Sequence, residues 1–168
     1  MAGEPSIRAP ARDDLPALVA IYNEAIAQRS ATGHLVPFAA AEREAWFAGH
    51  LLPETPLFVA ERDGAVAGYA TLAHYRGGRG AFAGCREVSY FVAECHRRQG
   101  VASALLGHAV AACPALGVDV LLAFLLGHNR PSVAFLERHG FACWGRLPGV
   151  ARIDGERRDH LVYGRQLG

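Results

Sequence analysis

The chain has 168 residues, of which 51% are hydrophobic and 20% are charged. This length and composition predict one folded domain spanning residues 1–168 with a substantial core, and they exclude a disordered or fibrous protein. The net charge of +1 gives no reason to expect nucleic-acid binding. All 17 basic residues are arginine, so an anion site here would use guanidinium or backbone N–H groups, and a Schiff-base lysine is excluded.

The sequence also shows no targeting or metal-binding pattern. The first residues lack the basic-then-apolar order of a signal peptide, and the longest apolar run, Val120–Leu126, is far too short to span a bilayer. We therefore expect no membrane partner and a cytoplasmic location. The four cysteines have no CxxC spacing, which favours reduced thiols over disulfides and predicts no bound metal.

Hydrophobic periodicity and turn residues divide the first half of the chain into helices and strands. Asp13 or Asp14 is expected to cap the first helix, and Trp46 and Phe47 are expected to face inward from the second. In chain order the predicted elements are an edge strand at 7–8, a helix with apolar positions from 15 to 26, a helical segment at 39–51, strands at 57–61 and 65–75 around an Asp63-Gly64 turn, a flexible loop at 76–80, and a strand at 87–92.

The second half of the chain alternates helices with strands. Its predicted elements are a basic turn at 95–100, a helix from Val101, an apolar strand at 118–125, a helix that starts near Pro131 and stops at Gly140, and strands at 141–147 and 160–165. The charged stretch 151–159 is interpreted as a loop. The order β-α-α-β-β-β-α-β-α-β-β combines hairpins with helical crossovers. It predicts the α/β class, with a mixed, partly antiparallel and partly parallel central sheet and helices on both faces.

The strand at 87–92, the following basic turn and the helix after it are the most informative segment. A glycine-containing turn that opens a helix offers unpaired N–H groups and the positive end of the helix dipole to an anion. Gly100 and Ala102 would let a pyrophosphate approach the backbone, while Arg97 and Arg98 would add charged hydrogen bonds. The patterns GxxxxGK[ST] and GxGxxG do not occur here. From the residues alone, an exposed arginine-rich turn is an equally good interpretation.

Two motifs resemble the signatures of the GNAT superfamily of N-acetyltransferases. Residues 97–102, Arg-Arg-Gln-Gly-Val-Ala, match the motif [R/Q]-x-x-G-x-[G/A], which binds the pyrophosphate of acetyl-CoA in that superfamily. Residues 129–141 resemble the second signature, N-x-x-S-x-x-[F/L]-Y-E-x-x-G-F. With the element order, the resemblance covers residues 7–167 and implies the acyl-CoA N-acyltransferase architecture with splayed central strands. Shorter pieces resemble the phosphinothricin and methionine-sulfoximine acetyltransferase group, namely 21–26, 79–82, 87–92 and 164–167.

The resemblance also implies which residues bind acetyl-CoA. In this superfamily the strand before the motif pairs its backbone groups with the pantetheine arm, as an added strand would. Asn129 either contacts the pantetheine through its amide or caps the helix before Pro131, and these roles are compatible. The implied cofactor-binding residues are Tyr90, Phe91, Val92, Arg97, Arg98, Gln99, Gly100, Val101, Ala102, Ser103, Asn129 and Ser132, with Phe135 and Arg138 as weaker candidates.

The resemblance places Glu87 where phosphinothricin-type enzymes keep their general base. An ammonium must lose a proton before its nitrogen attacks a thioester, and partial burial would raise the pKa of a glutamate toward neutrality. The alternative is a surface glutamate paired with Arg86 or Arg79. Arg79 matches the position of an arginine that grips the substrate carboxylate in the subgroup, with Phe82 as an apolar wall beside it. A mobile surface arginine is the alternative for Arg79.

The main departure from the family pattern is Leu136, which stands where the signature has a tyrosine that protonates the leaving CoA thiolate. Three explanations stay open: the thiolate leaves unassisted, another group such as Tyr163, Tyr90 or a water serves, or the protein binds CoA without efficient turnover. The 151–159 segment lacks the subgroup's usual Lys and Trp, which leaves the substrate open. Cys95 as a thiolate nucleophile is disfavoured, since no orienting third residue is in view.

The function implied by the resemblance is direct transfer of an acetyl group from acetyl-CoA to the primary amine of a small molecule, within a ternary complex. The implied acceptor is an amino-acid analogue such as phosphinothricin or methionine sulfoximine. The alternatives are a GNAT enzyme for an aminoglycoside, polyamine or protein N-terminus, and a non-catalytic acyl-CoA-binding module. Many members of the superfamily are dimers, so a homodimer is implied by resemblance alone.

Overall fold

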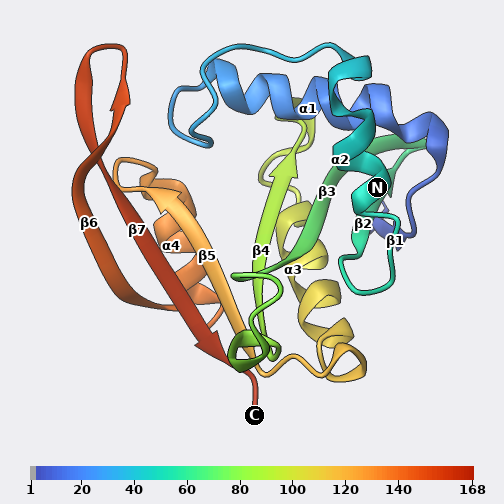
Figure 1. The fold of residues 1–168 in the computed structure, drawn as a ribbon. Coiled ribbons are helices and arrows are strands. Elements are labelled where there is room, and N and C mark those ends of the chain that lie inside the picture. Colours follow the sequence, from blue (N-terminus) through green and yellow to red (C-terminus); the bar gives the residue numbers. More distant parts are fainter. Residues whose placement is uncertain (1–2) are drawn as a thin grey trace.

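A computed structural model describes residues 3–168 of the chain and contains one seven-stranded sheet in the order β1-β2-β3-β4-β5-β7-β6 (Figure 1). Within the described residues only β4 and β5 are parallel neighbours, so the predicted mixed sheet is confirmed. The strands are β1 (Ser6–Arg8), β2 (Leu57–Arg62), β3 (Ala65–His74), β4 (Cys85–Val92), β5 (Val120–Leu126), β6 (Ala142–Ile153) and β7 (Glu156–Gln166). The helices are α1 (Leu15–Ala27), α2 (Glu44–Gly49), α3 (Val101–Ala112) and α4 (Arg130–Arg138).

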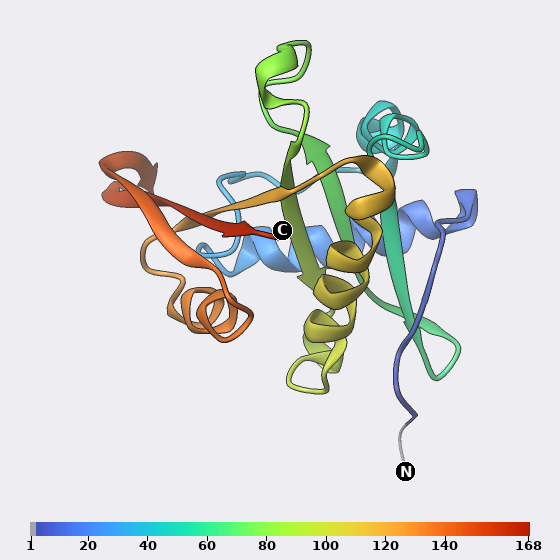
Figure 2. The same ribbon diagram turned by 90° about the horizontal axis from the view of Figure 1, so that it is seen from below.

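Helices cover both faces of the sheet, and each face has its own core. On one face α1 and α2 pack against alternate residues of β2 and β3, including Leu57, Val59 and Tyr69. On the other face α3 and α4 cover residues that point the opposite way, among them Ala70 of β3 and Leu121 of β5. Figure 2 shows α3 and α4 on the same side of the sheet. Each fully buried leucine in these cores stabilises the fold by about 1.5–3 kcal/mol, which makes the sheet a firm frame for the loops at its edges.

The start of α1 differs from the prediction that Asp13 or Asp14 caps it. Asp14 makes no side-chain cap bond to α1. Its carboxylate instead accepts the Ala11 N–H at 2.6 Å and the two guanidinium nitrogens of Arg8 at 2.7 and 2.9 Å. The reason is a short 3-10 turn at Arg12–Asp14, which moves the start of the helical segment back to Ala11 and makes Asp14 the residue that reaches back to it.

The expected loop at 151–159 is wrong, because this stretch is the tip of a long hairpin. Strand β6 continues to Ile153 and β7 begins at Glu156, with Asp154 and Gly155 as the turn between them. Both turn residues have positive φ, 49° and 85°, as a tight hairpin turn of this hand requires. The many charges suggested a loop, but they are tolerated in strands here because much of the arm is exposed.

The predicted helical segment at 39–51 is split into two pieces. A 3-10 turn covers Ala40–Arg43 and α2 covers only Glu44–Gly49. Phe47 is buried as expected, whereas Trp46 is half-buried. The remaining predicted helices and strands are present, with ends shifted by a few residues.

Candidate active site

A gap opens between the two parallel strands at the centre of the sheet. Strands β4 and β5 pair through only three residues of β4, where Cys85, Arg86 and Glu87 face Val120, Leu121 and Leu122. Beyond Glu87 the strands diverge toward their carboxyl ends (Figure 1), as the family resemblance implied. Backbone groups of residues 88–92 that face β5 therefore lack a neighbouring strand, and they are free to pair with an extended ligand.

The gap contains a cavity of about 70 Å³ lined by residues from both strands and from α4. On the β4 side it is lined by Val88, Ser89, Tyr90 and Phe91, and on the other side by Ala123, Phe124, Leu125, Asn129, Ser132 and Leu136, with Ala31 also contributing. Of the expected cofactor residues, Tyr90, Phe91, Asn129 and Ser132 are thus brought together. The surroundings are narrow and mostly apolar, which suits a slender amide-bearing chain.

The turn between β4 and α3 offers a row of free amides. The first intrahelical hydrogen bond of α3 runs from the Ala104 N–H to the Gly100 carbonyl at 3.0 Å. Among the described residues, the amides from Arg98 to Ser103 have no hydrogen-bond acceptor. These donors and the helix dipole together favour an anion. The N-terminus of α3 lies at the carboxyl end of β4, the same end at which the gap is open (Figure 1).

Two residues of this turn have left-handed backbone conformations. Gly100 has φ of 81° and Arg98 has φ of 60°. A Cβ atom on Gly100 would meet no heavy atom within 4 Å, so the glycine is required for its φ and leaves open space in front of the turn. Arg98 and Gln99 are exposed and Arg97 is half-buried, so all three side chains remain within reach of solvent.

Glu87 lies where the paired and the splayed parts of β4 meet. It is half-buried, and burial raises the pKa of its carboxyl group above the usual value. Its neighbour Val88 packs in the core under α3, so by strand alternation Glu87 faces the α1 side of the sheet. The described residues show no ion pair to Glu87. Arg86 is buried and donates instead to the carbonyls of Ala83 and Cys85, at 2.8 and 3.1 Å, so the expected alternative of an Arg86–Glu87 pair is absent.

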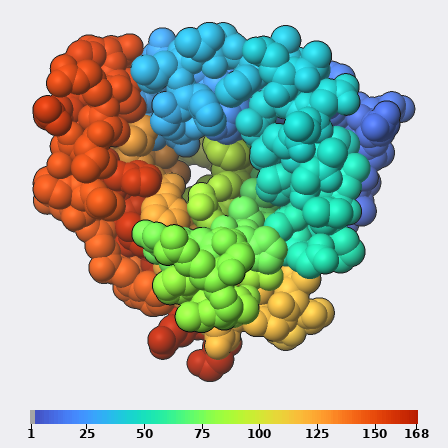
Figure 3. Space-filling view, viewed as in Figure 1, coloured from blue at the N-terminus to red at the C-terminus, as the bar shows by residue number. Residues whose placement is uncertain are grey.

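A hollow lies on the α1 side of the sheet, which is the side that Glu87 faces. Figure 3 shows it bordered by the α1 region in blue, the segment after β3 in green and the C-terminal strands in orange to red. Phe124 faces the same side, since Ala123 and Leu125 on either side of it lie in the α3 core. Its ring is 6.3 Å from Tyr75 and 5.5 Å from His160.

The aromatic residues around Phe124 were not predicted from the sequence. They come from the segment after β3, from β5 and from β7, so no local motif brings them together. Phe82 does belong to this group, because its ring lies 5.5 Å from Tyr75 and it is 39% exposed. Arg79 is exposed in the same segment, and the described residues give its side chain no ion pair.

The comparisons with known proteins agree with this geometry. Residues 18–141 match the model of the acetyltransferase (GNAT) family. The chain belongs to the GNAT family. Among the relatives of this GNAT protein, a Bacillus subtilis protein named provisionally as a phosphinothricin acetyltransferase is 44% identical over 155 residues, which is 92% of this chain and 94% of that protein. The L-methionine sulfoximine/L-methionine sulfone acetyltransferase of Pseudomonas aeruginosa is 33% identical over 92% of this chain and 90% of its own.

The fold of this GNAT protein closely matches solved structures. A GNAT superfamily phosphinothricin acetyltransferase from Sinorhizobium meliloti, crystallised in complex with acetyl-CoA, superposes with a TM-score of 0.91 at 29% identity. The match covers 98% of this chain and 89% of that one. The expected architecture, an open mixed sheet with splayed central strands, is therefore confirmed.

Residues of the second GNAT signature form the α4 side of the gap. The Asn129 side-chain oxygen accepts the Ser132 N–H at 3.3 Å, so Asn129 does cap α4, and its amide NH2 has no acceptor among the described residues. Phe135 packs against the Tyr90 ring at 5.0 Å. Burial raises the pKa of Tyr90 to about 12, partly offset by a hydrogen bond from Ser132. Tyr90 is therefore a neutral phenol at physiological pH. Arg138 is exposed at the end of α4.

The position of the signature tyrosine is occupied by a core residue in this GNAT protein. Leu136 is 1% exposed and lines the gap. The two tyrosines considered as substitutes lie in different places. Tyr90 lines the gap, whereas the Tyr163 hydroxyl donates to Glu137 at 3.1 Å and its residue does not line the cavity. Cys95 is exposed, and the described residues show no hydrogen bond from its thiol to His96.

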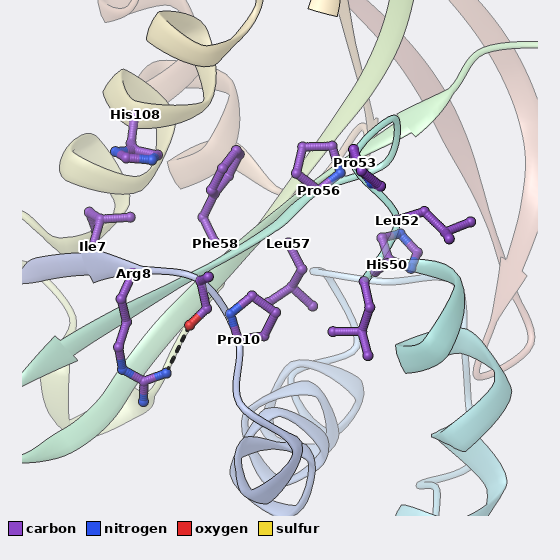
Figure 4. Close-up of a pocket in the computed structure, with 12 residues that line it drawn as sticks. Ile7, Arg8, Pro10, His50, Leu52, Pro53, Pro56, Leu57, Phe58 and His108 are labelled. Atoms are coloured by element: carbon purple, nitrogen blue, oxygen red, sulfur yellow. Dashed lines mark hydrogen bonds between the residues drawn. The ribbon is translucent and has the colours of Figure 1, made fainter.

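Three further observations concern features outside the gap. Within residues 3–168, no three His, Cys, Asp or Glu side chains are grouped closely enough to hold a metal ion. In the same residues, no helix has the length and apolar character needed to cross a membrane. An open apolar groove of about 420 Å³ lies between β1, β2 and the segment after α2 (Figure 4). There Arg8 is hydrogen-bonded to the Ala9 carbonyl, and the groove shares no residue with the gap.

Proposed function

We propose that the protein is an acetyl-CoA-dependent N-acetyltransferase for the primary amine of a small amino-acid-like molecule. The observation that carries this proposal is the course of the β4–β5 gap. At its open end stand the free amides of the α3 turn, and at its closed end stands the half-buried Glu87. The names of the relatives and the acetyl-CoA complex of the Sinorhizobium protein support the same activity.

The residues present suit the diphosphate and the pantetheine arm of acetyl-CoA. The amides from Arg98 to Ser103, with the guanidinium groups of Arg97 and Arg98, would bind the diphosphate. The unpaired backbone of Tyr90, Phe91 and Val92 would bind the pantetheine arm as an added strand. The free amide NH2 of Asn129 would donate to a pantetheine carbonyl.

Acetyl-CoA supplies the thioester whose acetyl group is transferred, and the chain's own residues do the rest. Glu87 would take the proton from the acceptor ammonium, directly or through a water, and its raised pKa suits that task near neutral pH. A β4 backbone N–H that faces the gap would stabilise the negative charge that develops on the thioester oxygen. Tyr90 lines the gap and would protonate the departing thiolate in place of the tyrosine missing at Leu136.

The acceptor would bind in the hollow on the α1 side, against Glu87. Phe82, Tyr75 and Phe124 provide an apolar wall there, and Arg79 would pair with the acceptor carboxylate. With the thioester held in the gap and the amine held beside it on the α1 side, direct transfer within a ternary complex would be the natural mechanism. Assembly as a homodimer stays a prediction, which sedimentation of the full chain would test.

The test is the release of CoA thiol from acetyl-CoA with a panel of amines. We expect release with methionine sulfoximine, phosphinothricin or related amino acids, and little with polyamines or aminoglycosides. Release with polyamines or aminoglycosides alone would keep the chemistry and overturn the acceptor class. Tight binding of acetyl-CoA without release for any amine would favour a non-catalytic acyl-CoA-binding module, the second candidate, which Leu136 motivates.

A further inference from the structure

An arginine at the end of β2, which β3 and β4 separate from the gap, is hydrogen-bonded to the anion-binding turn. Arg62 ends β2, and its Nη1 donates to the backbone carbonyl of Gln99 at 3.0 Å across 37 residues of sequence. Its side chain is only 9% exposed. The Nε atom is buried without a hydrogen-bond partner among the described residues and lies 3.8 Å from the Asp63 carboxylate. The polar group that this guanidinium engages at hydrogen-bond distance is therefore a carbonyl of the turn.

This hydrogen bond determines how one peptide group of the turn is oriented. No peptide bond in the described residues is cis, so the carbonyl of Gln99 and the N–H of Gly100 point in opposite directions. With the carbonyl held by Arg62, the Gly100 N–H is directed away from β2. The same N–H belongs to the row of amides without an acceptor, so it is left available to a ligand.

The turn needs such a support because of its backbone conformation. Arg98 has φ of 60° and Gly100 has φ of 81°, so the residues before and after Gln99 both have left-handed backbone conformations. A non-glycine residue in this region is disfavoured and persists when its surroundings fix it. Gln99 itself contributes one local bond, from its Nε2 to the Cys95 carbonyl at 3.0 Å. The Arg62 bond is the long-range constraint.

We propose that Arg62 is a positioning residue for the co-substrate: it fixes the Gln99–Gly100 peptide so that the Gly100 N–H joins the α3 amides in binding the diphosphate. The proposal rests on the proposed acetyl-CoA site. Arg62 acts from behind the turn, since β3 and β4 lie between β2 and the gap in the sheet order. It acts through the peptide, and no direct contact with the co-substrate is required.

The experiment compares Arg62→Met, which keeps the apolar stem but no donor, with Arg62→Lys, which keeps a donor and the charge. Each is assayed with acetyl-CoA and with S-acetylpantetheine, which lacks the diphosphate. We expect Arg62→Met to raise the KM for acetyl-CoA about tenfold, as loss of one charged hydrogen bond would, with kcat unchanged. The KM for S-acetylpantetheine should not change, and Arg62→Lys should restore most of the affinity. Arg12→Met, at an exposed arginine, is the matched control.

Salt separates positioning from simple charge attraction. At about 1 M salt the Debye length is about 3 Å, so a long-range effect of the lost charge would disappear. A positioning effect would persist as the ratio of the KM values of Arg62→Met and the unmodified protein. Thermal unfolding of each variant checks that the fold is intact.

Three results would overturn the proposal. They are an unchanged KM for acetyl-CoA in Arg62→Met, an equal rise for both co-substrates, or a rise that vanishes at high salt. Failure of the proposed function looks different, because the unmodified protein would then show no diphosphate-dependent preference for acetyl-CoA over S-acetylpantetheine.

Discussion

Exchanging Gly100 for asparagine or aspartate tests the anion site with a nearly isosteric pair. Gly100 is exposed with φ of 81°, and a Cβ there meets no heavy atom within 4 Å. Neither side chain therefore clashes in the free protein. Asparagine and aspartate both tolerate the left-handed region better than other residues, so each should lower stability by a similar amount, about 1 kcal/mol. The difference between the two variants isolates the negative charge.

The size of that difference follows from Coulomb's law. Two unit charges about 4 Å apart repel by about 1 kcal/mol in water and about 4 kcal/mol at an effective dielectric constant of 20. For an exposed turn the lower part of this range applies, about 1–2 kcal/mol, which is a factor of roughly 5–30 in affinity. Titration calorimetry with CoA should therefore give a Kd for Gly100→Asp that exceeds the Kd of Gly100→Asn by this factor. Equal Kd values for the two variants would refute a diphosphate in front of this turn.

Three further predictions concern the base, the packing of β3 against β4 and the start of α1. Glu87→Gln should lower kcat/KM about 10²–10⁴-fold at neutral pH. It should also abolish the fall in rate toward acid pH, whose midpoint in the unmodified protein lies above the usual glutamate pKa because burial raises it; an identical acid limb in the variant would exclude this base. Gly68→Ala places a Cβ 2.6 Å from the Phe91 carbonyl oxygen, so thermal unfolding should show a loss of about 1–3 kcal/mol, and an unchanged melting temperature would contradict that contact. Asp14→Asn should cost about 2–3 kcal/mol in urea unfolding at neutral pH. The Arg8 hydrogen bonds lower the pKa of Asp14, so this stabilisation is present above the ordinary aspartate pKa and is lost as pH falls through the lowered value; a difference that stays constant down to strongly acid pH would speak against the pair.

The parts of the site that sequence could predict are those built from one continuous segment. The strand at 87–92, the turn at Gly100 and the helix from Val101 follow one another, so periodicity and a single glycine are enough to indicate their arrangement. The same holds for the Asn129 cap, where Pro131 marks the helix start. In these places the interactions are between near neighbours in the chain, and residue type is a direct guide to geometry.

The parts that sequence could not predict depend on contacts between distant segments. The Arg62 bond to Gln99 spans 37 residues, and the Phe124 environment joins three separate segments. No spacing rule connects such residues before the sheet order is known. The hairpin tip at 151–159 is hard to predict for another reason. Its charged composition is typical of loops, and only the pairing of residues 151–153 with 156–158 shows that it is two strands.

The short contact between the two central parallel strands has a mechanical consequence. Strands β4 and β5 are paired through three residue pairs, from Cys85–Val120 to Glu87–Leu122. Beyond these pairs lies the gap, along which the backbone of β4 has no neighbouring strand. An extended ligand in the gap would act as an eighth strand. Its amides would hydrogen-bond the two parts of the sheet on either side of the gap, which are otherwise joined only at one end. Binding of the co-substrate would then stabilise the sheet. The β4 amides of the complex should exchange more slowly with solvent deuterium than those of the free protein, and release of the product should restore the faster exchange.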